Sequence, residues 1–273
     1  MRQALIVAGL DRLLRVEPVI IGLALIAFLA LDSGCGALAH ERAGQNPGSP
    51  STRGQSPDPA VTALFRWAPG ATGPDLSGPP VTPSAPRRYW HWRIQTGGAV
   101  GIINERWVGY LAKDPTYFLV GGTLRAADPA DWAAHRLMVE GRALTFDEVK
   151  RLPTDTAGMS VFLFEPYPTA GFTPRIFGEA VELAIAPTPP SALAAAYRSI
   201  SQRPEVHYAG KVIDPLGRPG IGLVFEFGGV QNQLVVDPRT GAALANRAIS
   251  TSSGAIQFST VVLAAEWTDS VPT

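Results

Sequence analysis

The sequence predicts an α+β domain, with an antiparallel, mostly meander sheet, about three helices packed on one face, and an apolar export helix before it at the N-terminus. Three observations support this class. Apolar and polar residues alternate in short segments between residues 89 and 267, as in half-buried strands. Helix-start signals and helical apolar spacing are confined to residues 145–200. An uncharged apolar run follows arginines near the N-terminus.

The apolar run covers residues 19–31, contains no charge, and follows Arg2, Arg12 and Arg15. This order of charge and apolar core is typical of an export segment. A helix from residue 18 to residue 31 would be about 21 Å long, whereas the hydrocarbon core of a bilayer is about 30 Å thick. The run is therefore too short to span a membrane alone, and a longer helix would bury Asp32.

Three fates of this segment remain open. Ala37, Leu38 and Ala39 match the small-residue pattern for cleavage after Ala39. An uncleaved anchor with a cytoplasmic N-terminus is the second. The third is lipid attachment at Cys35, although Asp32 stands where a lipobox has an aliphatic residue.

Residues 40–87 are rich in Pro, Gly, Ser and Thr, which predicts a disordered linker. Within them, residues 61–67 form a short apolar island that could dock as a helical turn or a strand. The predicted organisation is a signal peptide or membrane anchor at 1–39, the linker at 40–87, and an extracytoplasmic α+β domain at 88–273.

Composition excludes several classes of protein. The 23 basic and 23 acidic residues give no net charge, so nucleic acid is not indicated as a partner. A single cysteine excludes an internal disulfide framework and a cysteine-based structural zinc site.

The first strands follow residue 88. Residues 89–95 place Trp90, Trp92 and Ile94 on one face of a strand, and Gly97-Gly98 offers a turn into a second strand at 100–111. These two strands form a predicted hairpin. Residues 117–120 and 137–139 are shorter candidate strands.

Three helices are predicted next. Thr145 and Glu148 have capping-box spacing, and Pro153 stops the helix that they start. The second helix has Thr173 as its cap and Pro174 as its first residue and ends before Pro187. Ser191 is the predicted cap of the third, in which Leu193, Ala196, Tyr197 and Ile200 fall on one stripe.

The C-terminal part predicts a meander. Strand patterns occur at 206–212, 221–227, 231–236, 242–249 and 256–267, and short turns rich in Gly, Pro and Asp separate them. Strands joined by short turns pair with their sequence neighbours, so the sheet is antiparallel, and the helices would cover its apolar face.

Several motifs stand out along the chain: the early tryptophans, ERWVG at 105–109, LTFDEVKRLPTD at 144–155, PPSALAAAYRSISQRPEV at 189–206, DPLGRPG, and LVVDPRTG. Together they resemble a family of uncharacterised, membrane-tethered actinobacterial extracytoplasmic proteins. The match covers residues 88–273 and is most specific at 189–241. The resemblance implies one transmembrane helix and an extracytoplasmic domain of unknown function. The short N-terminal region and the brief apolar segment depart from the family pattern.

The sequence contains no recognised catalytic motif, and no catalytic, cofactor-binding or metal-binding residue is predicted. The histidines His40, His91, His135 and His207 lie far apart in sequence and form no metal-ligand pair. Asp147 and Glu148 are explained by the start of a helix. Trp90, Trp92 and Trp107 lie on two strands predicted to pair, so they could form an aromatic core or line a groove for an apolar ligand.

The sequence therefore predicts an exported, membrane-associated, non-enzymatic binding or regulatory module of the bacterial cell envelope. Its membrane contact would be the N-terminal segment, and its partner an apolar ligand or an envelope protein. Two alternatives stay open: a carrier of lipid or another apolar ligand with a sheet-and-helix groove, and a cell-envelope hydrolase whose site is dispersed along the chain.

Overall fold

The computed structural model describes residues 64–74, 76, 85–97, 101–120, 122–128, 135–164 and 175–272. All of them belong to the compact unit Gln55–Thr273. The predicted export segment, Cys35, Ala39 and the Thr173 cap lie outside the described residues. Among the helices within these ranges, none is long and apolar enough to cross a membrane.

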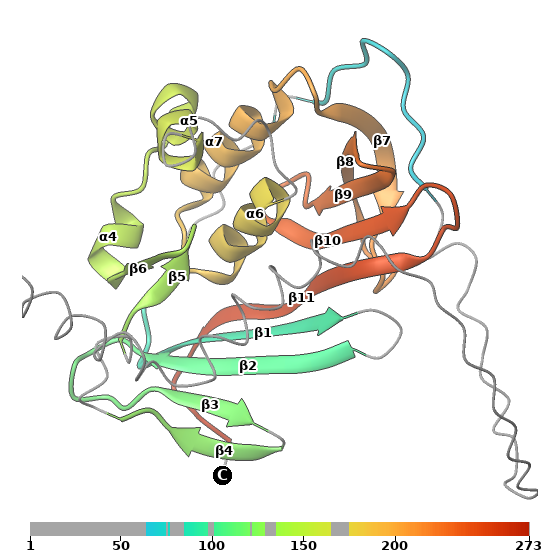
Figure 1. Ribbon diagram of the computed structural model, residues 1–273. Coiled ribbons are helices and arrows are strands. Elements are labelled where there is room, and N and C mark those ends of the chain that lie inside the picture. The colour runs from blue at the N-terminus through green and yellow to red at the C-terminus, as the bar shows by residue number, and fades with distance from the viewer. Residues whose placement is uncertain are drawn as a thin grey trace, which may run out of the picture. The chain divides into compact units, whose positions relative to one another are not determined.

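One antiparallel sheet dominates the described part of the chain (Figure 1). Its strand order is β4-β3-β2-β1-β11-β10-β9-β8-β7. The bounds are β1 Tyr89–Gly97, β2 Gly101–Gly109, β3 Tyr117–Val120, β4 Thr123–Ala126, β7 His207–Ile213, β8 Pro219–Phe227, β9 Val230–Val236, β10 Ala243–Ser250 and β11 Ile256–Thr268. The predicted meander is confirmed as two runs of strands, β1 to β4 and β7 to β11, in which sequence neighbours pair. The two runs meet where β1 pairs with β11.

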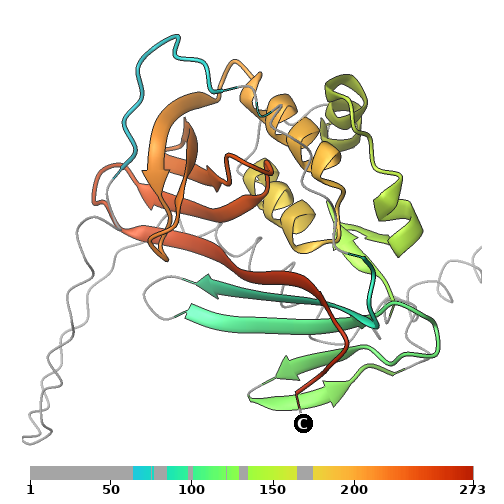
Figure 2. The same ribbon diagram turned by 180° about the vertical axis from the view of Figure 1, so that it is seen from behind.

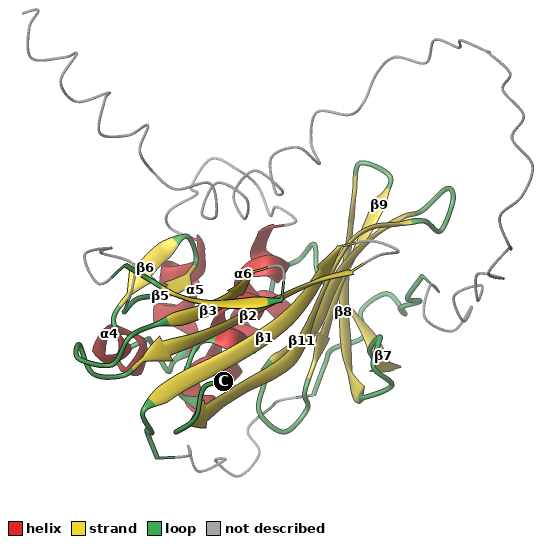
Figure 3. Ribbon diagram, turned by 90° about the horizontal axis from the view of Figure 1, so that it is seen from below, coloured by secondary structure: helices red, strands yellow, loops and turns green. Residues whose placement is uncertain are grey.

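Along the chain, a separate hairpin and the helices come between β4 and β7, the ends of these two runs of strands. The hairpin consists of β5 (Leu137–Val139) and β6 (Arg142–Leu144). Four helices fall within the described residues: α4 Phe146–Lys150, α5 Thr156–Phe164, α6 Arg175–Ile185 and α7 Pro190–Ser201. Figures 2 and 3 show the helices on one side of the twisted sheet. We call this side the inner face and the opposite side the outer face.

The helix starts agree with the sequence in one case and differ in another. The capping box is confirmed, because the Glu148 amide donates to the Thr145 hydroxyl at 3.2 Å and the Thr145 amide donates to the Glu148 carboxylate at 2.7 Å. The Ser191 cap is wrong. Helix α7 begins at Pro190 after Pro189, which makes no side-chain cap bond. Pro190 has no amide hydrogen to cap and its φ already suits a first helical turn, so the cap and the first helical residue lie two residues earlier than predicted.

Two apolar clusters hold the sheet, one on each face. The main core lies between the inner face and the helices, where the Phe177 ring of α6 meets Phe225 of β8 edge to face at 5.3 Å. The smaller cluster lies on the outer face and is built from Val235, Ala245 and Val261. The sheet is therefore buried on both faces along β8 to β11.

Candidate functional site

The three tryptophans predicted from the sequence do not share one face. Trp90 pairs with Val108 and points into the main core, where its indole nitrogen donates to the Ile185 carbonyl at 2.6 Å. Trp92 alternates with Trp90 and also packs against this core. Trp107 pairs with His91, so it lies on the outer face. Two of the indoles thus contribute to the packing of the inner face.

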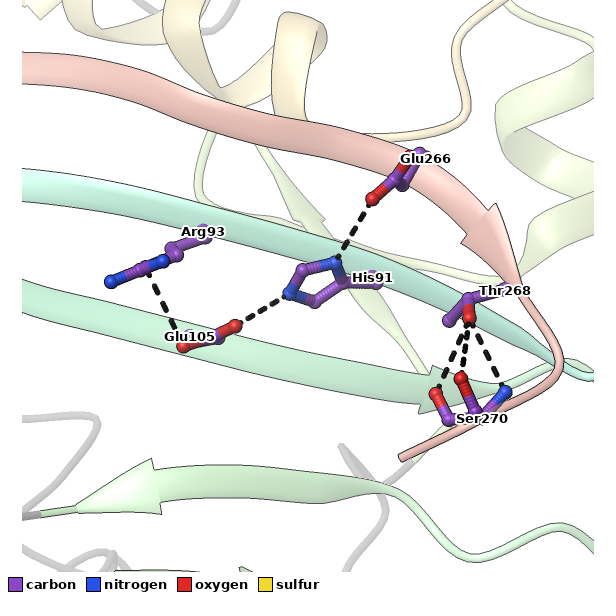
Figure 4. Close-up of polar contacts among 6 residues, drawn as sticks. All are labelled: His91, Arg93, Glu105, Glu266, Thr268 and Ser270. Atoms are coloured by element: carbon purple, nitrogen blue, oxygen red, sulfur yellow. Dashed lines mark hydrogen bonds and ion pairs between the residues drawn. The ribbon is translucent and has the colours of Figure 1, made fainter. Parts of the chain in front are cut away.

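A polar ladder lies on the outer face of β1, β2 and β11 (Figure 4). The His91 ring stacks on Trp107 at 4.7 Å, and His91 Nε2 lies 2.8 Å from Glu105 Oε1. Arg93 Nε lies 3.6 Å from the second oxygen of Glu105, and Glu266 Oε1 is 3.7 Å from His91 Nδ1. These groups partner one another across neighbouring strands, which is typical of cross-strand stabilisation.

Buried carboxyl groups gather where the β5–β6 hairpin meets helix α6. Glu140 has a φ of 56° and Gly141 a φ of 66°, as the two central residues of a type I′ turn require. A positive φ is uncommon for Glu. The Glu140 carboxylate lies 3.5 Å from the Arg142 guanidinium. On α6, Arg175 Nε donates to Glu179 Oε1 at 2.5 Å.

Burial shifts the titration of two of these carboxyls. It raises the pKa of Glu140 to about 7, against the opposing charges of Arg142 and Arg175. It raises the pKa of Glu179 to about 8, and the negative charge of Glu182 adds to this rise while Arg175 opposes it. Both acids therefore hold a proton near neutral pH more readily than an exposed glutamate.

A surface hollow on the helix side of the described chain has a volume of about 400 Å³. It is lined by Leu144, Glu148, Arg151, Leu152, Pro153 and Phe162. Neither Glu140 nor Glu179 is among the lining residues, so the two raised-pKa acids do not open into it. Within the ranges that the structure describes, no three His, Cys, Asp or Glu side chains converge as metal ligands.

The most elaborate site of the described chain lies on the outer face of β7 to β10. An extended segment covers it, formed by residues 64–74 and residue 76, which we call the clasp. The clasp is neither helix nor strand. The Phe65 amide donates to Gln231 Oε1 at 2.7 Å, and Gln231 Nε2 donates back to the Phe65 carbonyl at 3.0 Å. One side chain of β9 thus binds both backbone groups of one clasp residue.

The Gln231 amide is held in place by its neighbours. Gln233 Nε2 donates to Gln231 Oε1 at 2.7 Å, and Gln231 Nε2 also donates to Glu226 at 3.1 Å. Gln231 is 1% exposed and Gln233 0% exposed. The sheet thus supplies two of the four hydrogen bonds of this amide, and the backbone of Phe65 supplies the other two.

The Phe65 ring occupies a slot beside this amide. The slot is formed by the apolar cluster of Val235, Ala245 and Val261 with Val212 packed against it. Gly222 of β8 makes the room, since a Cβ there would lie 3.2 Å from Phe65 Cδ2 and 2.8 Å from Val212 Cγ1. The Arg247 guanidinium, 2% exposed as a residue, lies 5.5 Å from the centre of the Phe65 ring.

The clasp then passes around the edge of the sheet. Trp67 stacks on His207 of the edge strand β7 at 5.1 Å and an interplanar angle of 4°. A Cβ on Gly73 would collide with the Tyr197 hydroxyl of α7. Leu76 reaches the main core on the inner face. Figure 1 shows the clasp as the cyan segment beside β7. It therefore contacts both faces of the sheet and covers β7.

Sequence reasoning identified the apolar island of the clasp but none of the groups that receive it. Phe65 and Trp67 fall within that island and dock without helical or strand geometry. Gly222 was the available signal, since a glycine inside a strand often marks a close approach of another group. Gln231 and Gln233 had a second signal, because three consecutive polar residues, 231–233, stand in the strand pattern of β9, of which the structure buries all but the first residue.

Comparisons with known proteins give no family. No family model matches the chain, and no curated protein matches it. Solved structures of MucB are weakly similar. One, in complex with MucA(peri), has 11% identity and a TM-score of 0.27 and covers 64% of this chain and 48% of that chain.

Two further structures are similar to the same degree. The Pseudomonas aeruginosa MucA/MucB complex has 14% identity and a TM-score of 0.29, with 65% of this chain and 51% of that chain covered. A structure of MucB has 13% identity and a TM-score of 0.28, with 70% and 57% covered. The chain thus spans about half the length of the proteins it matches. Likeness at this level assigns neither a family nor a function.

Proposed function

We propose that this chain is an exported, membrane-associated binding or regulatory module of the bacterial cell envelope, which acts without catalysis. The observation that carries the proposal is the Gln231 pair of hydrogen bonds to Phe65. A surface that holds an extended segment by its backbone and seats its aromatic side chain in a slot has the features of a peptide-recognition site. The export segment at residues 19–31 supports the location.

The motifs at residues 88–273 support membership of the actinobacterial, membrane-tethered family that the sequence resembles. The proposal for the N-terminus keeps its three forms, which are cleavage after Ala39, acylation at Cys35, and a retained anchor. Intact-mass measurement of the chain from membrane and supernatant fractions distinguishes the three by mass. A reporter that is active only outside the cytoplasm, fused to the C-terminus, tests export. We expect activity, and a reporter active only inside the cell overturns the location.

One observation favours a second function, a cell-envelope hydrolase. Burial raises the pKa of Glu140 to about 7 and that of Glu179 to about 8, the range in which the general acid of a hydrolase works, although neither side chain lines the surface hollow. Hydrolysis of a cell-wall polymer that is lost in both Glu140→Gln and Glu179→Gln would establish it. Activity that is equal in wild type and variants, or absent in all, leaves binding as the function.

A third function is a carrier of lipid or another apolar ligand. Its place would be the open surface hollow of about 400 Å³, where Leu144, Leu152 and Phe162 contribute apolar surface beside Glu148 and Arg151. Native mass spectrometry of the purified chain tests this function. A bound lipid that is lost when Leu152→Arg fills the pocket supports it, and a chain that carries no lipid contradicts it.

A further inference from the structure

The contacts to the clasp separate into two kinds that select different features of a ligand. Gln231 reads the amide and the carbonyl of Phe65, which every residue except proline offers. The slot at Gly222 holds the phenyl ring of Phe65, and His207 stacks on the indole of Trp67, two residues further along the chain. The site therefore fits an extended peptide with aromatic side chains at positions i and i+2.

The clasp is bound in a manner that permits exchange. Residues 64–67 are held by one side-chain amide, one ring in a slot and one stacked pair. A single hydrogen bond or aromatic pair contributes only modestly to stability, because the same groups interact with water when they are free. A peptide with equivalent groups can replace these contacts one for one, while the strands beneath keep their own ladder.

The anchoring of the clasp indicates where a replacement would come from. Leu76 is buried in the main core and Gly73 packs against Tyr197, so the C-terminal end of the clasp stays with its own molecule. This short connection keeps residues 64–67 close to their own slot. An external occupant is therefore more readily a segment of a different protein than the clasp of a second copy.

We propose that the ring slot at Gly222, together with Gln231 and His207, is a recognition site on the outer face for an extended Phe-x-Trp segment of a partner protein, and that Phe65 and Trp67 are its internal occupant. This inference rests on the proposed binding function and names the partner class. The clasp competes with the partner at the high effective concentration that tethering gives, so partner binding requires its release.

The test uses the full-length chain in detergent and a fluorescein-labelled peptide of residues 64–73, measured by fluorescence anisotropy. The variant Phe65→Ala/Trp67→Ala vacates the slot, and we expect it to bind the peptide about tenfold or more tightly than wild type. Adding Gln231→Ala or Gly222→Val to this variant should abolish the gain. A peptide with both aromatics replaced by alanine is the matched control and should not bind.

Three results overturn the proposal. The first is a folded Phe65→Ala/Trp67→Ala variant, shown by cooperative thermal unfolding, that binds no peptide. The second is binding that Gly222→Val leaves unchanged. The third is a wild-type dimer in sedimentation that Phe65→Ala dissociates, since the occupant is then a second copy. These results are distinct from failure of export, which the reporter fusion measures independently of peptide binding.

Discussion

The two faces of the sheet are buried by different means. The inner face is covered by helices and packed with large apolar side chains such as Phe177, Leu223 and Phe225. The outer face of β8 to β10 combines small apolar residues with Gln231, Gln233 and Arg247, all at most 2% exposed, and an extended segment covers it. Apolar packing stabilises a fold without selecting a ligand, whereas a satisfied polar network selects geometry. We therefore expect the inner face to contribute most to stability, and the proposed recognition site lies on the outer face.

The largest effect should come from the inner face. Phe177→Ala removes a fully buried ring and should lower the free energy of unfolding by about 3–5 kcal/mol. Phe227→Ala is the control, because this ring is 65% exposed and its loss should change stability by less than about 0.5 kcal/mol. Urea unfolding measures both. Equal effects in the two variants would break the comparison.

The buried acids make the stability of the helix side depend on pH. The folded-state pKa of Glu179, at about 8, lies above its ordinary value of 4.5. Its contribution is therefore fully present below pH 4.5 and is lost as pH rises through about 8. Because Glu179 is only 3% exposed, solvent screens this effect little. We expect the free energy of unfolding of wild type to fall by about 2–5 kcal/mol between pH 5 and pH 9 through this group.

The matched variants for this pH effect are Glu179→Gln and Glu148→Gln, compared by thermal unfolding at pH 5, 7 and 9. Glu179→Gln should flatten the decline in stability. Glu148→Gln should preserve the decline. Hydrogen bonds from Thr145 lower the pKa of Glu148, so its carboxylate contributes to stability equally at pH 5, 7 and 9. Glu140, whose pKa burial raises to about 7, leaves a smaller decline in Glu179→Gln, so a decline as steep as that of wild type contradicts the prediction.

On the outer face, Gln231→Ala should remove the oxygen that accepts hydrogen bonds from the Phe65 amide and from Gln233 Nε2. The expected loss in stability is about 1–3 kcal/mol. The clearer sign is release of the clasp, measured as faster tryptic cleavage after Arg66, an exposed residue. Gln257→Ala, at an exposed position of β11, is the control and should cleave at the wild-type rate.

The smallest effect is expected for Trp67→Ala, which removes only the stack on His207. We expect a loss of about 0.5–1.5 kcal/mol, with an increase in cleavage at Arg66 smaller than in Gln231→Ala. Thermal unfolding and the tryptic assay measure the two quantities. A larger release from Trp67→Ala than from Gln231→Ala would shift the main contact of the clasp from the amide to the indole.

Local patterns in the sequence predicted the parts of the fold that local interactions determine. The β1–β2 hairpin, the Thr145 capping box and the order of the C-terminal strands each follow from neighbouring residues. The pairing of β1 with β11 joins residues far apart in sequence, and no local pattern encodes that register. Helix α5 escaped prediction because its apolar residues do not form a helical stripe.

The candidate site was harder to predict because its parts come from separate segments. Phe65 and Gln231 lie 166 positions apart, and only the folded sheet brings them together. Glu140 and Glu179 meet for the same reason, across a hairpin and a helix. The sequence suggested the docking of residues 61–67 but offered no partner for it.

Hydrogen exchange of the Phe65 amide tests the central claim most directly. This amide donates to a buried side-chain oxygen at 2.7 Å, in a segment without helix or strand. We expect the hydrogen of this amide to exchange slowly in wild type and at the rate of an unprotected peptide in Gln231→Ala. Unprotected exchange of this amide in wild type would contradict the claim that the outer face binds an extended peptide.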